Sequence, residues 1–312
     1  MSRRVALVLS VVAALVLVAA GFYVARNPER KTLDAAARAG VPGSFVRLSD
    51  GITQYDLSGS ETGRVIVLLS GASVPFYIWD STSTALAANG FRVLRYNYYG
   101  RGYSDRPDLR YDLATYDRQL TDLLDALGLG GRVDVAGLSM GGPIAANFAD
   151  RHPERVRTLT LVDPAFSMFS RAPLAIRAPV VGKYLLTVAA APGMAKGQYD
   201  DFLHPERYPD WATRYEVQMQ YKGFLRSLLQ SRRGDVLTRP ASSFTSLARS
   251  GIPVLLLWGK QDHTVPLPKS DSIRSAFPRA EFHAIDSAGH LPNIEEAAQV
   301  DSILISFLRA HV

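Results

Sequence analysis

The chain has 312 residues, of which 47% are hydrophobic and 21% charged, a composition typical of a globular protein with a sizeable core. This composition excludes a largely disordered chain. The net charge of +6 comes from arginines and lysines scattered along the sequence, and no basic tract indicates nucleic-acid binding. The absence of cysteine excludes disulfides, thiolate metal ligands and a cysteine nucleophile.

The N-terminal segment, residues 1–25, is the most apolar part of the sequence. Its apolar run at 5–24 is about 20 residues long, enough to cross a bilayer as a helix. A cleaved signal peptide is the alternative, because the basic start and the small residues at 18–20 fit that class too. We favour a retained transmembrane anchor, since the run is longer than a usual signal sequence. Basic residues on both sides nearly cancel the orientation signal, and we expect a domain outside the cytoplasm, either anchored or secreted.

Residues 26–43 are polar and small, with several prolines and glycines, and predict a linker with one short helix. Beyond it, apolar or alternating runs predict strands at 44–48, 52–57, 65–69, 92–96, 133–136, 158–162, 254–258 and 281–285. Helical patterns cover 81–88, 113–127, 143–152, 271–277 and 294–310. This alternation predicts an α/β fold with an eight-stranded, mostly parallel sheet covered by helices on both faces. The first two strands are expected to form an antiparallel hairpin at one edge.

One long stretch, residues 165–250, contains helical patterns and no clear strand. An unstructured loop of that length is improbable, so the stretch predicts a helical cap over the sheet. The core of the fold then comprises residues 44–164 and 251–312. Ligands of open α/β sheets bind at the carboxyl ends of the strands, which an insertion at this point would cover.

A candidate nucleophile lies between the predicted strand 133–136 and the helix 143–152. Residues 137–141 read GLSMG, which matches G-x-S-x-G with Ser139 at its centre. On so sharp a strand-to-helix turn, side chains at the flanking positions would collide, which explains Gly137 and Gly141. The helix that follows directs its amides toward developing negative charge.

A serine hydroxyl needs a general base, and of the six histidines His290 has the right place. It follows the last predicted strand and precedes the C-terminal helix. His263 is the one other serious candidate for the general base. Asp262 follows strand 254–258 and is the candidate acid that orients the histidine. Asp163, after strand 158–162, is an alternative acid, and Asp286 is expected to cap the histidine loop.

An oxyanion hole requires two backbone amides directed at the developing charge. Met140, next to the candidate nucleophile, is expected to supply one of them. The loop after strand 65–69 reads SGAS, which makes the amide of Ala72 the second candidate, with Gly71 permitting close approach of the backbone.

These residues resemble the α/β-hydrolase superfamily from residue 44 to 312, and most closely its lipase, esterase and carbon–carbon hydrolase branch with a helical cap. The motifs that carry the resemblance follow the family's order: LLSG at 68–71, YGRGYS at 99–104, GLSMGG at 137–142, LVDP at 161–164, WGKQD at 258–262 and AGH at 288–290. The resemblance implies the triad, the two amides and the absence of a cofactor or metal. Two positions depart from it, because Ser70 stands where members often have histidine and Asn97 where they often have aspartate. A serine at position 139 argues against epoxide hydrolases and haloalkane dehalogenases of this fold, which use aspartate there.

The expected function is hydrolysis of a carboxylic ester, including acylglycerols or other amphiphilic esters, through a Ser139 acyl-enzyme. Carbon–carbon bond hydrolysis of a dienone acid and cofactor-free perhydrolysis would use the same triad. A non-catalytic binding protein on this fold is a third class. Cationic side chains near the pocket, with Arg177 and Arg214 as candidates, would favour an acid substrate. Apolar cap residues either line an acyl pocket or pack the cap onto the sheet: Phe202, Trp211, Tyr215, Tyr221, Phe224 and Leu225.

Overall fold

The computed structural model describes residues 2–170 and 177–312, and its centre is an eight-stranded sheet in the order β1-β2-β4-β3-β5-β6-β7-β8. The strands are β1 (Ser44–Leu48), β2 (Gly51–Gly59), β3 (Val65–Leu69), β4 (Arg92–Tyr96), β5 (Val133–Leu138), β6 (Val156–Val162), β7 (Val254–Gly259) and β8 (Glu281–Ile285). β2 pairs antiparallel with both β1 and β4, and the pairs from β4–β3 onward are parallel. The predicted fold class is therefore confirmed.

Both faces of the sheet are buried, and β3 shows how the sequence achieves this. Ile66 and Leu68 belong to one apolar cluster, while Val67 and Leu69 belong to another. Because successive strand residues point to opposite faces, a continuous apolar run supplies both layers. The first face is covered by α3 (Asp80–Ala88) and α14 (Ala297–Ala310), and the second by α4 (Leu113–Ala126), α5 (Gly141–Arg151) and α12 (Ser270–Ala276).

The predicted C-terminal helix 294–310 is two helices in the structure. α13 (Pro292–Glu295) ends at Glu296, whose φ of −125° and ψ of 45° are not helical, and α14 follows it. The interruption has a local cause, because the buried side chain of Glu295 binds the backbone of the loop before α13 instead of facing solvent.

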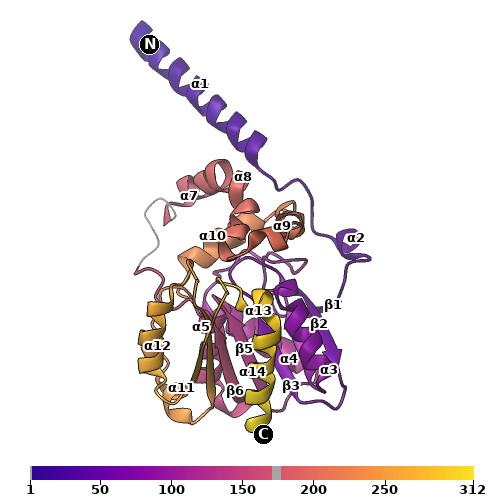
Figure 1. Cartoon of the computed structure of the whole chain (residues 1–312). Helices are drawn as coiled ribbons and strands as arrows, with labels where there is room; N and C mark the ends of the chain where they lie inside the picture. The colour runs from indigo at the N-terminus through magenta and orange to yellow at the C-terminus, as the bar shows by residue number, and fades with distance from the viewer. Residues whose placement is uncertain (1, 171–176) are drawn as a thin grey trace.

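The cap contains α7 (Pro179–Leu185), α8 (Ala191–Met194), α9 (Trp211–Met219) and α10 (Phe224–Arg233), which lie over one end of the sheet in Figure 1. The predicted cap range of 165–250 is too long at its end. α11 (Thr245–Ser250) packs on α5, where Leu247 joins the apolar core and its amide donates to Asp150 Oδ1 at 2.8 Å. Part of the predicted cap, residues 171–176, lies outside the described residues.

The N-terminal apolar run forms α1 (Arg3–Arg26), a helix of 24 residues with none buried, which extends away from the rest of the chain in Figure 1. Its length and composition suit a membrane span, and they suit a signal sequence as well. The linker after it contains the expected short helix, α2 (Ala35–Arg38). The linker is not free, because Lys31 N donates to Gln220 O at 2.8 Å and Lys222 N donates to Lys31 O at 2.9 Å. The chain after α1 is thus fastened to the cap.

Candidate active site

Ser139 occupies the turn between β5 and α5 with a backbone φ of 54°. A non-glycine residue in this left-handed region is strained and persists only where its surroundings hold it. Here the Ser139 amide donates to Val162 O at 2.9 Å, while its carbonyl accepts from the amides of Gly142 at 2.9 Å and Ala165 at 3.0 Å. These three hydrogen bonds fix the serine at the carboxyl end of the central strand.

The glycines of the GLSMG motif are required by sterics. A Cβ atom at Gly137 would lie 2.2 Å from the carbonyl oxygen of Gly141. A Cβ atom at Gly141 would lie 2.5 Å from the carbonyl oxygen of Leu69. Side chains at either position would displace the backbone, so the motif is explained by the shape of the turn.

The loop after β3 passes beside Ser139. A Cβ atom added to Gly71 would lie 3.5 Å from Ser139 Cβ and 4.0 Å from its Oγ. Ala72, the next residue, and Met140 line the same cavity. The two candidate amide donors are therefore brought to the vicinity of the serine by separate elements, the end of β3 and the start of α5.

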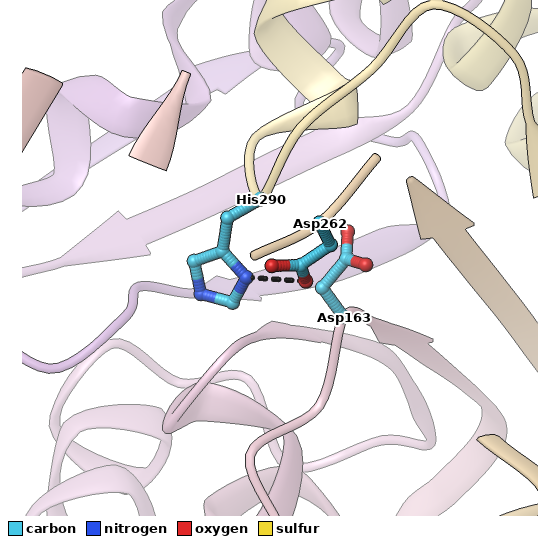
Figure 2. Close-up of side chains that lie close together, drawn as sticks. All are labelled: Asp163, Asp262 and His290. Atoms are coloured by element: carbon cyan, nitrogen blue, oxygen red, sulfur yellow. Dashed lines mark hydrogen bonds and ion pairs between the residues drawn. The ribbon is translucent and has the colours of Figure 1, made fainter. Parts of the chain in front are cut away.

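His290 and Asp262 form a buried pair at the carboxyl ends of β8 and β7. His290 Nδ1 lies 2.7 Å from Asp262 Oδ2, and the two residues are only 3% and 4% exposed (Figure 2). Asp262 Oδ1 accepts hydrogen bonds at 2.8 Å from the amides of Thr264 and Val265. The carboxylate is thus held from both sides, and it fixes which nitrogen of the imidazole faces away from it.

The pKa of His290 is raised above its ordinary value of 6.5. Burial alone would lower it, but the hydrogen bond to Asp262, the charge of Asp262 and the charge of Asp201 together outweigh burial. The imidazole is therefore a stronger base than a free histidine, which suits it to accept a proton from a hydroxyl. Among the described residues, the structure gives no hydrogen bond between the imidazole and Ser139 Oγ; such bonds are often long in ligand-free sites.

Asp163, the alternative acid, lies beside Asp262 (Figure 2). It is fully buried with a φ of 41°, and its Oδ1 accepts from the amide of Gly259 at 3.0 Å. Its pKa is raised well above the ordinary carboxyl range by burial and then by the charge of Asp262. Asp163 Oδ2 has no hydrogen-bond partner among the described residues, whereas the Asp262 carboxylate contacts the histidine, so the two aspartates take different places in the site.

The same three residues have the donor spacing of a metal site, with ligand atoms within 4.8 Å of one another. His290 Nδ1 and both oxygens of Asp262 are already engaged, because Nδ1 binds Oδ2 and Oδ1 accepts from two amides. A cation would have to break these bonds. The cluster fits an acid–base pair better than a metal centre.

The loop that carries His290 is fastened to the cap through Glu295, a residue that the sequence did not single out. Glu295 Oε2 accepts from the amide of Gly289 at 2.7 Å, and its Oε1 accepts from Leu203 at 2.8 Å and His204 at 3.0 Å. The amide of His290 donates to the carbonyl of Asp201 at 2.8 Å. The histidine is therefore positioned by the cap as well as by the core.

Between the cap and the serine turn lies a cavity of about 380 Å³, lined by Ala72, Ser73, Arg101, Met140, Phe169, Met194, Gln198, Tyr215, Leu228, Ser231, Arg232 and Leu237. Arg101 is 1% exposed and has no carboxylate partner within the described part of the chain. Its Nε donates to Ala72 O at 2.7 Å, while Nη1 and Nη2 donate to Ser227 Oγ and Ser231 Oγ, each at 2.9 Å. One guanidinium thus joins the Ala72 loop to α10.

Other sequence candidates lie away from this cavity. Of the six apolar cap residues, Tyr215 alone lines it. Phe202, Trp211, Phe224 and Leu225 pack in an apolar cluster with the sheet, and the ring of Tyr221 packs against that of Tyr103. Arg214 forms an ion pair with Asp80 at 2.9 Å, and Arg177 is exposed outside the cavity lining, so neither is the cationic residue expected there. His263 is exposed, and Asp286 pairs with Lys260 at 2.6 Å rather than capping the histidine loop. Arg101 could have been found from the YGRGYS motif, where a basic residue stands between two glycines.

Residues 64–297 match the model of the alpha/beta hydrolase fold family, and the chain belongs to this family. It is similar to 2-hydroxymuconate semialdehyde hydrolase of Pseudomonas putida, with 27% identity over 228 residues, which cover 70% of this chain and 76% of that protein. The protein is therefore a hydrolase of this fold.

Solved structures give the same fold. An esterase of Thermogutta terrifontis superposes with a TM-score of 0.73 at 21% identity, covering 86% of this chain and all (100%) of its own. A membrane phospholipase A superposes with a TM-score of 0.69 at 24% identity, covering 98% of this chain and 96% of its own. At these identities the likeness concerns the fold alone.

Proposed function

We propose that this hydrolase cleaves carboxylic esters through an acyl-enzyme on Ser139. The observation that carries the proposal is the strained Ser139 turn, held beside the Gly71–Ala72 loop at the same end of the sheet as the His290–Asp262 pair. Strain at a buried polar turn is a feature of functional sites, where it orients a side chain toward a substrate. A non-catalytic binding protein would have no need of this combination.

In the proposed reaction, His290 takes the proton of Ser139 Oγ as the oxygen attacks the ester carbonyl carbon. The carbonyl π bond becomes an oxyanion, which the amides of Ala72 and Met140 stabilise by hydrogen bonds. His290 then gives its proton to the leaving alcohol, and the acyl-enzyme remains. A water molecule repeats the sequence and releases the acid, while Asp262 stabilises the imidazolium in both halves.

A fluorophosphonate probe tests the activated serine directly. With the full chain in detergent micelles, labelling is expected for the wild type and is expected to be lost in Ser139→Ala and His290→Ala. Ser287→Ala is the matched control, because Ser287 also has a left-handed backbone, with φ of 59°, but is exposed on another turn. Labelling that survives in Ser139→Ala contradicts the proposal, and turnover of p-nitrophenyl esters of increasing chain length reports the acyl preference.

A second candidate reaction, hydrolysis of a carbon–carbon bond in a dienone acid, is favoured by the arginines of the cavity. Arg101 and the exposed Arg232 both line it, and guanidinium groups bind carboxylates well. The similar Pseudomonas putida protein is named as a 2-hydroxymuconate semialdehyde hydrolase. Loss of the dienone absorbance with a kcat/KM above that of the best simple ester would favour this reaction over ester hydrolysis.

We further propose that α1 is a retained anchor and that the catalytic domain lies outside the cytoplasm. Its 24 residues exceed a usual signal h-region and suffice to cross a bilayer. The mass of the protein extracted from membranes tests this, because a product lacking the first 20 or so residues would indicate a cleaved signal peptide and secretion instead.

A further inference from the structure

α7 exposes apolar side chains that have no partner in the described chain. Val180, Val181 and Leu185 are 81%, 50% and 43% exposed. Outside α1, the described residues include only two other exposed large hydrophobics, Val217 and Val312, so the exposed apolar surface gathers on this one cap helix. A local cluster of this kind marks a surface that contacts something other than water.

This apolar surface adjoins the end of α1. The rings of Tyr23 and Tyr184 stack at 6.4 Å between centroids with 19° between their planes. Lys183 Nζ lies 5.9 Å from the centroid of the Tyr23 ring, and Arg26 Nη1 donates to Val188 O at 3.5 Å. In Figure 1, α7 and α8 lie next to the point where α1 leaves the domain. A bilayer crossed by α1 would therefore reach its surface at the level of α7.

The charges around this junction suit the surface of a membrane. Arg26 ends α1 and Arg30 and Lys31 follow it, and the cap segment 177–199 contains three basic residues and no aspartate or glutamate. The one acid between Arg26 and Leu33, Glu29, is half-buried and accepts from the amide of Leu225 at 2.7 Å, so it is engaged with the cap. Basic side chains and tyrosines beside an apolar surface are typical of the lipid–water interface.

The segment that carries α7 also forms part of the cavity wall. Phe169 precedes it, and Met194 and Gln198 follow α7, and all three line the cavity with Ala72 and Met140. Arg233 Nη2 at the end of α10 donates to Ala178 O at 3.2 Å, which connects α7 to the helix that carries Leu228 and Ser231. The exposed apolar surface of α7 is therefore continuous with the roof of the candidate active site.

We infer that α7 lies in the interfacial region of the same bilayer that α1 crosses, with Val180, Val181 and Leu185 against the acyl chains, and that the substrates are esters of membrane lipids. This inference rests on the proposed ester hydrolysis and on the retained anchor. Basic residues at the junction favour contact of the protein with bilayers that contain anionic lipids.

The absence of cysteine in the chain permits a clean test. The full chain carrying Val181→Cys is labelled with the environment-sensitive dye NBD and reconstituted into phosphatidylcholine–phosphatidylglycerol vesicles containing nitroxide-labelled lipids. Strong quenching is expected with the nitroxide near the headgroup. Val12→Cys within α1 is the positive control, and Ser246→Cys, exposed on α11 and part of the core, is the negative control.

Each outcome decides the inference. Quenching at position 12 without quenching at 181 overturns the contact of α7 with lipid while keeping the anchor. The absence of quenching at both positions overturns the inference together with the anchor. Fluorescence at 181 that depends on the protein-to-lipid ratio and not on the nitroxide shows that a second copy of the chain covers α7, which also overturns it.

Activity provides a second measurement. The double variant Val180→Asp, Val181→Asp is expected to lose about tenfold or more in kcat/KM on a fluorogenic phosphatidylglycerol ester in vesicles, because its apolar contact is removed. Turnover of p-nitrophenyl butyrate is expected to stay unchanged, as is vesicle activity in the control Val217→Asp, where the exposed valine lies on α9. Absence of p-nitrophenyl butyrate turnover in the wild type means failure of the proposed function, whereas equal vesicle activity in the double variant means failure of this inference alone.

Discussion

The carboxyl ends of the strands and the cap above them are built on different principles. At the strand ends, Asp163, Asp262 and His290 are at most 4% exposed and are held by main-chain amides or by one another. The cap packs on the core through apolar side chains and is joined to it by a few polar side chains that reach across, chiefly Glu295 and Arg101. Backbone-held groups cannot easily move apart, whereas a cap held by side chains can be changed without rebuilding the sheet.

This difference separates the residues proposed to carry out the reaction from those that select the substrate. The groups proposed to move protons depend on strands that pack into the core on both faces, so a change there alters the rate of the reaction. The cap supplies most of the cavity wall, so a change there alters which ester is accepted and how the loops are aligned. Substitutions on each side of the boundary measure how complete this separation is.

The largest effect is expected for Asp262→Asn. An asparagine in this place can stabilise the wrong tautomer of His290, and kcat is expected to fall by about 10³- to 10⁴-fold without loss of the fold. Steady-state kinetics on a soluble ester and a circular-dichroism melt check this. If kcat fell equally far in Asp163→Asn while Asp262→Asn was nearly unaffected, Asp163 rather than Asp262 would be the acid that orients the histidine.

Arg101→Lys is expected to have the next largest effect. A lysine cannot bind Ala72 O, Ser227 Oγ and Ser231 Oγ together, so the Ala72 amide loses its alignment and kcat falls by roughly 10- to 100-fold. Because Arg101 acts through the loop, KM for a short soluble ester is expected to change little. The matched control is Arg232→Lys, which lines the same cavity but is exposed, and similar losses of kcat in both variants would contradict the alignment role.

Glu295→Gln tests the link between the cap and the histidine loop. The amide group of glutamine can accept only at its oxygen, which leaves at least one of the Gly289, Leu203 and His204 amides without an acceptor. Unfolding is expected to become easier by about 1–3 kcal/mol. Denaturant unfolding measures this against Glu296→Gln, a half-exposed neighbour for which the structure gives no side-chain hydrogen bond. Equal stability of the two variants would show that the link contributes nothing.

The smallest effect is expected in the pH dependence. Because neutral His290 is the proposed base and its pKa is raised, kcat/KM should rise with pH with a midpoint above 6.5. The pKa values of His290 and Asp163 are both raised on folding. The native state therefore holds more protons than the unfolded chain in this pH range. The free energy of unfolding should consequently fall as pH rises from about 5 to 8. The Asp163→Asn variant, whose side chain stays neutral at every pH, should keep the kinetic midpoint and show a shallower fall. A kinetic midpoint that drops in this variant would mean that Asp163 is ionised in the wild type.

Short-range sequence patterns predicted the strands and turns whose conformation depends on a few neighbouring residues. The apolar runs predicted the eight strands to within two residues at each end, and the GLSMG motif indicated a turn that only glycines at 137 and 141 permit. Chain order and strand ends also identified Asp262 and His290 as a pair, since residues that follow neighbouring parallel strands meet at one edge of the sheet.

Only the tertiary structure decided the contacts that join distant segments. Arg101 meets Ser231 across 130 positions, Leu203 meets Glu295 across 92, and Asp163 meets the Asp262 loop through Gly259 across 96. No local period or motif encodes such contacts, because they depend on how the cap and the strand ends pack in space. For the same reason the sequence could not assign α11 to the core, and it could not show that Asp163 is buried beside Asp262, which raises the pKa of Asp163.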